Sequence, residues 1–530
     1  MGTFWKQGEP KVWATAAALS ATLLMIATLL VVVLVHGLGY FWPSDLTLAN
    51  LKDGSRLLGE ITAGEKATAS HGERLQFKVG NRDLYSQDYR WVDLEDISSR
   101  SLPKDAIALE RKEHGNFYGF LKSLSLEGLN VQPSAEPWND LQRALSLVAA
   151  SREKLRGTEK AMSRVNGEAE ALRLKIRKLE YAKGDPARIA AMTQEREKVL
   201  ARFNTILERF NTEMEELGRP EALFTDAAGE EKEIALMDIV RAWRPNDMGV
   251  LAKSAFYAGK TGEMLLDEPR ESNTEGGLFP AIFGTVMMVI LMSLFSLPFG
   301  VIAAVYLREY AREGVIVRLV RIAVNNLAGV PSIVYGVFGL GFFVYGIGGS
   351  IDAFFYPERL PTPTFGTGGI LWASLTLALL TVPVVIVSTE EGLAAVPKGL
   401  REGSLSLGAT KLQTLLKVVL PMATPGIMTG MILAMARAAG EVAPLMLVGV
   451  VKLAPSLPID GTFPFFHMDR KFMHLGFHIY DVGFQSPNVE AAKPMVFVTT
   501  LLLLAIVITA SSAAILIRNR MKQKYATKAF

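Results

Sequence analysis

The sequence predicts an α-helical polytopic membrane protein with six transmembrane helices and a large external α+β insertion between the first two. Half of its 530 residues are hydrophobic and the mean hydropathy is positive, which excludes one ordinary soluble domain. Six windows lack Asp, Glu, Lys and Arg over lengths close to or beyond the roughly 20 residues that cross a bilayer as a helix. These windows are 12–35, 276–307, 322–351, 360–389, 418–436 and 494–517.

The first window is typical of an uncleaved transmembrane helix rather than a signal peptide. Lys6 and Lys11 precede the apolar run 12–35, which is longer than the 7–15 residues or so of a signal core. Residues 40–42, Tyr-Phe-Trp, are aromatic side chains of the kind that anchor a helix at the membrane surface. We therefore expect residues 1–40 to hold a cytoplasmic N-terminus and transmembrane helix 1.

Basic residues collect before the first window, between the second and third, between the fourth and fifth, and after the sixth. Because Lys and Arg concentrate in cytoplasmic loops, this alternation predicts cytoplasmic N- and C-termini and places residues 41–275 on the external side of the membrane. The basic residues are Lys6, Lys11, Arg308, Arg312, Arg318, Arg321, Lys398, Arg401, Lys411, Lys417, Arg518, Arg520, Lys522, Lys524 and Lys528.

The insertion at 41–275 differs in composition from the rest of the chain. It carries 35 Lys and Arg against 40 Asp and Glu, whereas the remainder carries 21 against 13. Within 55–110, alternating apolar residues such as Leu75 and Phe77 predict a small β-rich module.

Residues 138–217 predict a coiled-coil hairpin of two long helices. Apolar residues recur at steps of three and four on both sides of Gly184-Asp185-Pro186, which breaks the pattern. The charged residues along both helices indicate a solvated outer face. A docking surface for an external partner is the alternative to a plain solvated face.

The sequence holds no constellation for hydrolytic, redox or metal chemistry. It contains no cysteine, and no Gly-rich loop followed by Lys and Ser or Thr that would bind ATP. His467, His474 and His478 lie close together in the external loop 452–493, but Leu475 follows His474, so the zinc signature His-Glu-x-x-His is missing. We expect these histidines to be polar surface groups, with no metal, no cofactor and no catalytic residue in this chain.

Arg437 and Glu441 interrupt the fifth window, which continues beyond them as the apolar run 442–451. An ionisable side chain in the bilayer costs at least about 2.5–3.5 kcal/mol, so such residues face a bundle interior or a water-filled path. At four residues apart the two share a helix face and can pair. The pair either stabilises the helix bundle or gates a substrate path. In the second case the planar guanidinium N–H donors of Arg437 would suit an oxyanion.

The polar segment between the fourth and fifth windows resembles the EAA loop of ABC-importer permeases. That loop reads, in outline, Glu-Ala-Ala, three residues, Gly, about nine residues, an aliphatic residue, one residue and Leu-Pro. Glu402, Gly408, Val418, Leu420 and Pro421 fill the pattern, with Gly403 and Ser404 in place of the alanines. The resemblance implies that the loop 390–421 is gripped by an ATPase subunit, through Arg401, Glu402, Gly403, Gly408, Ala409, Leu420 and Pro421.

Three further stretches are similar to PstA-type permease subunits of the bacterial phosphate ABC importer. Residues 434–445 read Ala-Met-Ala-Arg-Ala-Ala-Gly-Glu-Val-Ala-Pro-Leu, and residues 329–336 read Gly-Val-Pro-Ser-Ile-Val-Tyr-Gly. Residues 297–301, Leu-Pro-Phe-Gly-Val, lead to Tyr-Leu-Arg-Glu-Tyr at 306–310. The likeness covers about 275–517, which is under half of the chain.

This resemblance implies a permease transmembrane domain at 276–517, a cytoplasmic tail at 518–530 and a chain that is not itself an enzyme. A periplasmic phosphate-binding protein would deliver inorganic phosphate to a path formed by this chain and a second, PstC-type permease subunit. An ATPase subunit dimer would bind ATP and Mg²⁺ and drive alternating access across the bacterial inner membrane. Arg437 and Glu441 would then line the substrate path.

Two features depart from the family pattern. Val387 stands where many relatives carry Arg before Ser-Thr-Glu, which leaves open another oxyanion such as sulfate or molybdate. The insertion 41–275 replaces a brief external loop, and its role is open. The paralogous second phosphate permease subunit is a further alternative. A membrane-anchored periplasmic sensor or scaffold is a remote one, because the tail from Arg518 holds only 13 residues.

Overall fold

The computed structural model describes residues 9–67, 72–126, 136–216, 218, 220–461, 463–486 and 489–526. Lys6, Leu217 and Lys528, used in the sequence-based predictions, lie outside these ranges. The chain divides into two compact units. Unit 1 comprises 1–40, 264–269 and 276–530, and unit 2 comprises 41–263 and 270–275.

Unit 1 is built from six helices that are long and apolar enough to cross a membrane, which confirms the predicted fold class. Three of these helices contain π-helical turns, a feature that is frequent at functional sites. The six are α2 (Glu9–Gly39), α7 (Phe279–Val305) with η3 (Tyr306–Tyr310), α9 (Ser332–Phe338) continued by η4 (Gly339–Gly348) and α10 (Gly349–Phe355), α11 (Ile370–Ala394), α13 (Lys411–Thr414) continued by η6 (Leu415–Val419) and α14 (Leu420–Gly440), and α17 (Val489–Ala526).

Helix α11 is the centre of unit 1. In its most apolar stretch 67% of the residues are buried, against 6% in α2 and in α17. Glycines let its neighbours approach closely: a Cβ added to Gly300 of α7 would lie 2.5 Å from Val385 of α11. Such small-residue contacts are typical of packed transmembrane helices. Helix α17 packs on α14 and α2, with His36 of α2 stacked on Phe497 at 4.9 Å.

The third predicted window, 322–351, is wrong in its boundaries. The structure has a separate amphipathic helix, α8 (Val315–Leu327), and the span begins only at Ser332. Pro331 explains the break, because proline lacks an N–H and pushes the preceding residue out of the helical region.

Unit 2 contains two five-stranded antiparallel sheets with strand orders β4-β3-β2-β1-β5 and β10-β6-β7-β8-β9. The β-structure is therefore more extensive than the predicted module at 55–110, because the second sheet recruits strands from both sides of the hairpin. The strands are β1 (Leu46–Leu51), β2 (Arg56–Glu65), β3 (Arg74–Lys78), β4 (Tyr89–Asp93), β5 (Ile97–Ser101), β6 (Ile107–Arg111), β7 (Phe117–Ser125), β8 (Glu221–Thr225), β9 (Glu231–Ala235) and β10 (Ile239–Trp243).

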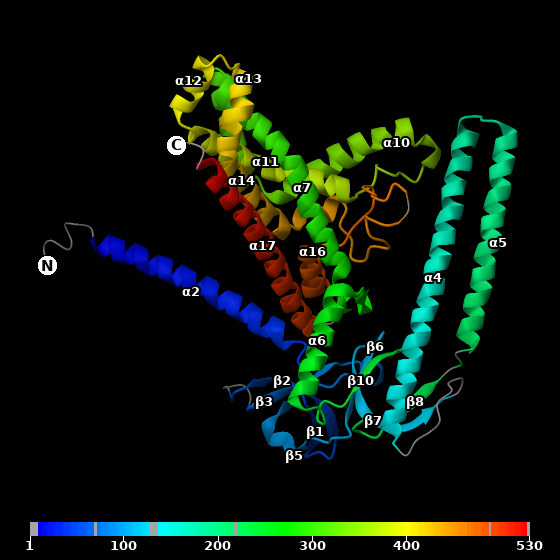
Figure 1. Cartoon of the computed structure of the whole chain (residues 1–530). Coiled ribbons are helices and arrows are strands. Elements are labelled where there is room, and N and C mark those ends of the chain that lie inside the picture. The colour runs from blue at the N-terminus through cyan, green and yellow to red at the C-terminus, as the bar shows by residue number, and fades with distance from the viewer. Residues whose placement is uncertain are drawn as a thin grey trace. The chain divides into compact units, whose positions relative to one another are not determined.

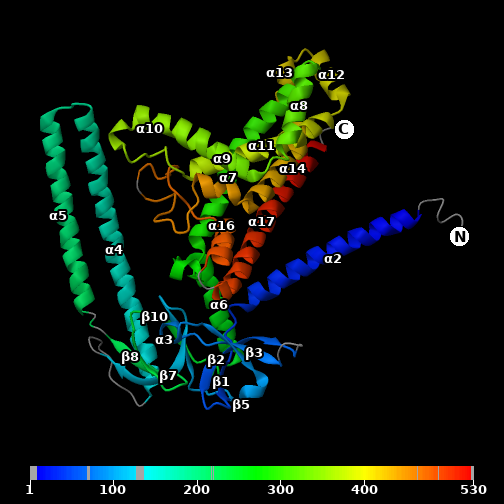
Figure 2. The same ribbon diagram turned by 180° about the vertical axis from the view of Figure 1, so that it is seen from behind.

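The hairpin consists of α4 (Pro137–Tyr181) and α5 (Pro186–Glu216), which run side by side in both views (Figures 1 and 2). Val165, Ala169 and Val199 form part of the apolar seam between them. The base of α4 joins the core of the second sheet, where Leu141 is fully buried beside Phe224. The hairpin is thus rooted in the sheet rather than loosely tethered.

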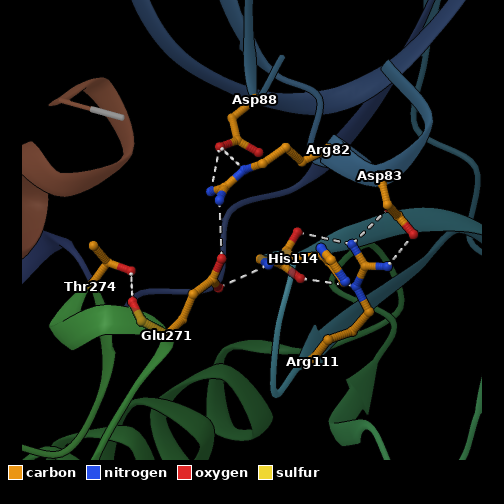
Figure 3. Close-up of polar contacts among 8 residues, drawn as sticks. Arg82, Asp83, Asp88, Arg111, His114, Glu271 and Thr274 are labelled. Atoms are coloured by element: carbon orange, nitrogen blue, oxygen red, sulfur yellow. Dashed lines mark hydrogen bonds and ion pairs between the residues drawn. The ribbon is translucent and has the colours of Figure 1, made fainter. Parts of the chain in front are cut away.

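Segment 270–275 is held to the body of unit 2 by polar contacts (Figure 3). Arg82 pairs with Asp88 at 2.8 Å and with Glu271 at 3.1 Å. The other Glu271 oxygen accepts a hydrogen bond from the N–H of Gly115 at 2.9 Å, and Thr274 donates to the Glu271 carbonyl at 2.7 Å. Glu271 therefore connects the end of the insertion to the first sheet and to the turn before β7.

Glu275, in the same segment, has a carboxylate oxygen (Oε2) that is shielded from water and has no hydrogen-bond partner among the described residues. Burial, together with the nearby Glu110 and Glu271, raises its pKa from 4.5 to about 7, although Lys78 opposes the shift. An unpaired buried carboxylate is unfavourable, so this group favours folding when it is protonated.

The folded-state pKa of Glu275 lies above its unfolded value, so its favourable contribution is full below about pH 4.5 and is lost as the pH rises through about 7. We expect Glu275→Gln to raise the melting temperature of unit 2 at pH 8 and to change it little at pH 5. Each kcal/mol corresponds to roughly 2–4 °C in a domain of this size. Tryptophan fluorescence during thermal unfolding measures this, because Trp42, Trp91, Trp138 and Trp243 lie in unit 2.

The control is Glu233→Gln on β9, where the side chain is exposed. Between pH 5 and pH 8 the melting temperature of the wild type should fall relative to that of Glu275→Gln. If it does not, the raised pKa assigned to Glu275 is contradicted.

Candidate functional site

The loop between the fourth and fifth spans is a pair of short helices, α12 (Lys398–Ser406) and α13 (Lys411–Thr414). Gly408 joins them with a φ of +85°, a left-handed conformation that glycine adopts without strain. Thr410 caps α13: its hydroxyl accepts from Gln413 N–H while the Gln413 side chain accepts from Thr410 N–H. Ser404 and Thr414 hydroxyls lie 2.9 Å apart and hold the two helices together.

Arg401 points into the protein rather than toward solvent. Its Nη2 lies 3.1 Å from Oε1 of Glu309 and donates to the Leu393 carbonyl at 2.5 Å. Lys411 donates to the Glu309 carbonyl and lies 4.6 Å from the Tyr310 ring centroid. Glu309, in the π-helical end of the second span, thus anchors both helices of the loop.

The remaining predicted coupling residues separate into two groups. Glu402, Gly403 and Gly408 are exposed, and Ala409 is half-buried. Leu407, beside Gly408, is 90% exposed. Leu420 and Pro421 instead lie within the continuous helix Lys411–Gly440, where the π-helical turn η6 precedes the proline. The outward surface of the loop is therefore made by the turn and not by the Leu-Pro end.

Arg437 and Glu441 form an ion pair, with Nε 3.6 Å from Oε1. The pair does not lie on one helix, because α14 ends at Gly440 and Glu441 is extended, with φ −79° and ψ 132°. Side-chain exposure is 33% for Arg437 and 20% for Glu441. The pair therefore sits at the end of the helix opposite the α12–α13 loop and is open on one side.

The fold brings the two phosphate-permease-like segments together. Helix α9 packs on α15 (Ala443–Val448), and a Cβ on Gly336 would lie 2.7 Å from Pro444 Cα. Tyr335 is buried in the same cluster as Ala438 and Leu445. The Gly-Val-Pro-Ser segment thus supports the chain just beyond Arg437 and Glu441.

Helix α11 carries position 387, where the sequence departs from the family pattern described above. Val387 is half-buried there. Three residues later, Glu390 lies 3.4 Å from Nε of Arg321, which comes from α8. Arg321 contacts Glu390 on α11, and no side chain at position 387 supplies a positive charge.

The three histidines have separate roles. His474 is buried and caps α16 (Leu475–Tyr480) by accepting from Gly476 N–H at 3.1 Å, and burial lowers its pKa to about 3. His478 lies 3.2 Å from the Thr499 hydroxyl, and His467 lies 3.0 Å from Asp460. The prediction of polar surface groups is wrong for His474 and His478. No group of three or more His, Asp or Glu in the described ranges could hold a metal.

Glu309 is the residue that sequence reasoning missed. It belongs to the Tyr-Leu-Arg-Glu-Tyr stretch that carried the family resemblance, but no role followed from the motif alone. The sequence did hold a signal for it. Glu309 is an acidic residue among basic ones at the end of the second span, and the loop predicted on the same side of the membrane carries Arg401.

Gly336→Ala tests the close contact between α9 and α15. The added Cβ would meet the backbone of Pro444 at 2.7 Å, so we expect overpacking that costs about 1–3 kcal/mol. The matched control is Gly341→Ala in the same continuous helix, where no atom lies within 4 Å. Thermal unfolding of the detergent-solubilised chain measures both, and equal melting temperatures for the two variants would contradict the contact.

Comparison with known proteins identifies the family of the chain. A model of the family described as "Binding-protein-dependent transport system inner membrane component" matches residues 296–523. The phosphate transport system permease protein PstA of Mycobacterium leprae is 39% identical over 175 residues, covering 33% of this chain and 52% of PstA. The probable ABC transporter permease protein YqgI of Bacillus subtilis is 31% identical over 224 residues, covering 41% of this chain and 70% of YqgI.

Among solved structures, an inward-facing MetNI methionine ABC transporter is 21% identical with a TM-score of 0.34, covering 46% of this chain and 95% of that one. The chain spans only 52–60% of the length of several relatives, including PstA from M. leprae and from Methanocaldococcus jannaschii. The family match and the coverage of YqgI decide the assignment. This chain belongs to the binding-protein-dependent transport system inner membrane component family, as a multi-pass, non-catalytic permease component.

Proposed function

We propose that this chain is the permease subunit of an ABC importer that moves inorganic phosphate across the bacterial inner membrane. A separate ATPase subunit would drive alternating access through the α12–α13 loop. The observation that carries the proposal is the continuous helix Lys411–Gly440, which joins this loop at one end to the Arg437–Glu441 pair at the other.

Phosphate is favoured by the relatives named PstA and by the chemistry of the pair. The Arg437 contact with Glu441 uses Nε at 3.6 Å, which is too long for a strong hydrogen bond. A guanidinium presents five N–H donors in a plane that matches phosphate oxygens. Arg437 is therefore suited to bind an oxyanion in passing and to return to Glu441 afterwards.

The proposed partners are a second, PstC-type permease subunit, an ATPase subunit dimer that binds ATP and Mg²⁺, and a periplasmic phosphate-binding protein. Glu402, Gly408 and the exposed Leu407 form the surface offered to the ATPase. This arrangement would place both termini and α12–α13 in the cytoplasm and unit 2 in the periplasm, where the hairpin would contribute to docking of the binding protein.

Another oxyanion is the second candidate, and Val387 is the observation that favours it. If an arginine at that position attracts phosphate in relatives, this chain has one positive charge fewer near the path. Competition of radiolabelled phosphate uptake by sulfate or molybdate separates the two, because a phosphate permease should be insensitive to either.

Arg437→Ala should reduce phosphate uptake at least about tenfold, since a charge-assisted hydrogen bond to a buried anion is worth about 1.5–3 kcal/mol. Arg437→Lys should retain more uptake than Arg437→Ala, because lysine keeps the positive charge and loses only the planar set of guanidinium N–H donors. Arg359→Ala is the control, since this arginine contacts Thr364 in another loop at 3.0 Å. Normal uptake by Arg437→Ala, with normal protein levels, would show that the Arg437–Glu441 pair is not part of the substrate path.

Glu402→Lys should lower the amount of ATPase that co-purifies with the chain, because it reverses an exposed charge beside the turn. The exposed Glu313→Lys, between the second and third spans and outside the loop 390–421, is the control. Equal ATPase recovery from both variants would argue against the loop as the docking surface.

Glu309→Gln should uncouple transport while leaving the ATPase bound. The neutral side chain loses the ion pair with Arg401, so α12 is less firmly attached to the second span. The readout is phosphate transported per ATP hydrolysed in proteoliposomes. Partial recovery in the double variant Glu309→Arg with Arg401→Glu would support the pairing, and an unchanged ratio in Glu309→Gln would exclude it.

A further inference from the structure

We propose that α8 lies at the lipid headgroup boundary, with its exposed apolar face among the acyl chains and the neighbouring arginines on anionic lipid headgroups. This inference rests on the proposed function only for the statement that this side of the membrane is cytoplasmic. The inference concerns a surface that neither the coupling loop nor the substrate path uses.

One narrow face of α8 packs on the protein. Only Val317, Arg321 and Val324 are partly covered, and their spacing of four and three residues places them on one side of the helix. Both valines pack against a cluster of buried residues from α7, η3 and α11. Arg321 fixes the orientation, because it donates to the Leu307 carbonyl at 3.2 Å in addition to contacting Glu390.

Over its first two turns the opposite face of α8 is apolar and uncovered. Val315 is 74% exposed, Ile316 78%, Leu319 59% and Ile322 50%. Covering each such side chain is worth about 1.5–3 kcal/mol at full burial. A contiguous row of exposed apolar side chains is unfavourable in water. We therefore expect this face to lie in an apolar environment.

The position of α8 in the chain identifies that environment. It is joined to the second and third spans by 311–314 and 328–331, and four residues reach at most about 14 Å. The exposed apolar face of α7 ends in Tyr306 and Tyr310, which are 61% and 44% exposed. Tyrosines at the end of a span mark the membrane interface. Helix α8 therefore begins close to the interface and cannot leave the membrane surface. Figure 2 shows it at the same end of unit 1 as α12 and α13.

The charges around α8 favour anionic lipid. Arg308, Arg312 and Arg318 are exposed, and none has an acidic partner within 4 Å in the described part of the chain. An amphipathic helix with arginines beside its apolar face binds anionic leaflets through both features. Each arginine near an anionic membrane surface raises the affinity of the segment for that surface roughly fivefold.

The absence of cysteine from the natural sequence allows a direct test. Single cysteines at Ile316, Val317, Arg318 and Leu319 are spin-labelled in the full chain, co-expressed with its transporter subunits and reconstituted in vesicles of phosphatidylcholine and phosphatidylglycerol. Oxygen, which concentrates in lipid, should reach the labels at 316 and 319, whereas a water-soluble nickel complex should reach only the label at 318. The label at 317 should be protected from both.

Two results would overturn the lipid assignment. Nickel access at 316 and 319 would place this face in water, and protection of both sites from oxygen and nickel would place a protein subunit on it. Neither measurement requires transport, so failure of the phosphate proposal would leave these readings intact.

The headgroup contact has its own readout. The triple variant Arg308→Gln, Arg312→Gln and Arg318→Gln should lose the preference for spin-labelled phosphatidylglycerol over phosphatidylcholine, by about fivefold for each arginine removed. Arg359→Gln, outside this region, is the control. An unchanged lipid preference in the triple variant would exclude the arginines as the headgroup site.

Discussion

The crossing of α11 and α14 determines the geometry of unit 1. A Cβ on Gly426 would lie 2.6 Å from Gly392 Cα, so the two backbones are in contact. Lipid provides no hydrophobic drive between helices, and close small-residue contacts of this kind supply the packing energy. Because α14 continues from α13 without a break, its packing on α11 bears on the position of both the loop at one end and Arg437 at the other.

Ion pairs between different elements turn the loop end of unit 1 into one connected block. Arg401 joins α12 to the second span through Glu309, and Arg321 joins α8 to α11 through Glu390. Removing one member of such a pair leaves an uncompensated charge, which costs more than the pair itself contributes. The Arg401–Glu309 pair therefore connects α12 to the second span, in addition to its connection along the chain to α14.

The sequence was sufficient for features that depend on composition and period. Charge-free windows located six spans, and three- and four-residue steps located the hairpin, because both patterns follow from the solvent that each face meets. It was insufficient where a single residue decides the geometry. Pro331 divided one window into two helices, and Gly440 ended α14 before Glu441 could share its face. The second sheet of unit 2 was not foreseen because its strands come from both sides of a long helical hairpin, and no local period links them.

Side-chain direction was the other limit, and it bears on how the site works. The motif placed Arg401 among the outward coupling residues, whereas the structure turns it toward Glu309. Arg437 shows the opposite case: its only ion pair among the described residues is the 3.6 Å approach to Glu441, which leaves the Nη donors free. A neutral pair of this kind lowers the cost of placing a cation near the bilayer interior without occupying its donors. In the proposed function, an oxyanion that reaches this pair would meet Arg437 without a second guanidinium from position 387. Its binding would compete with Glu441 for Arg437, and α14 connects Arg437 to the loop that the ATPase would contact.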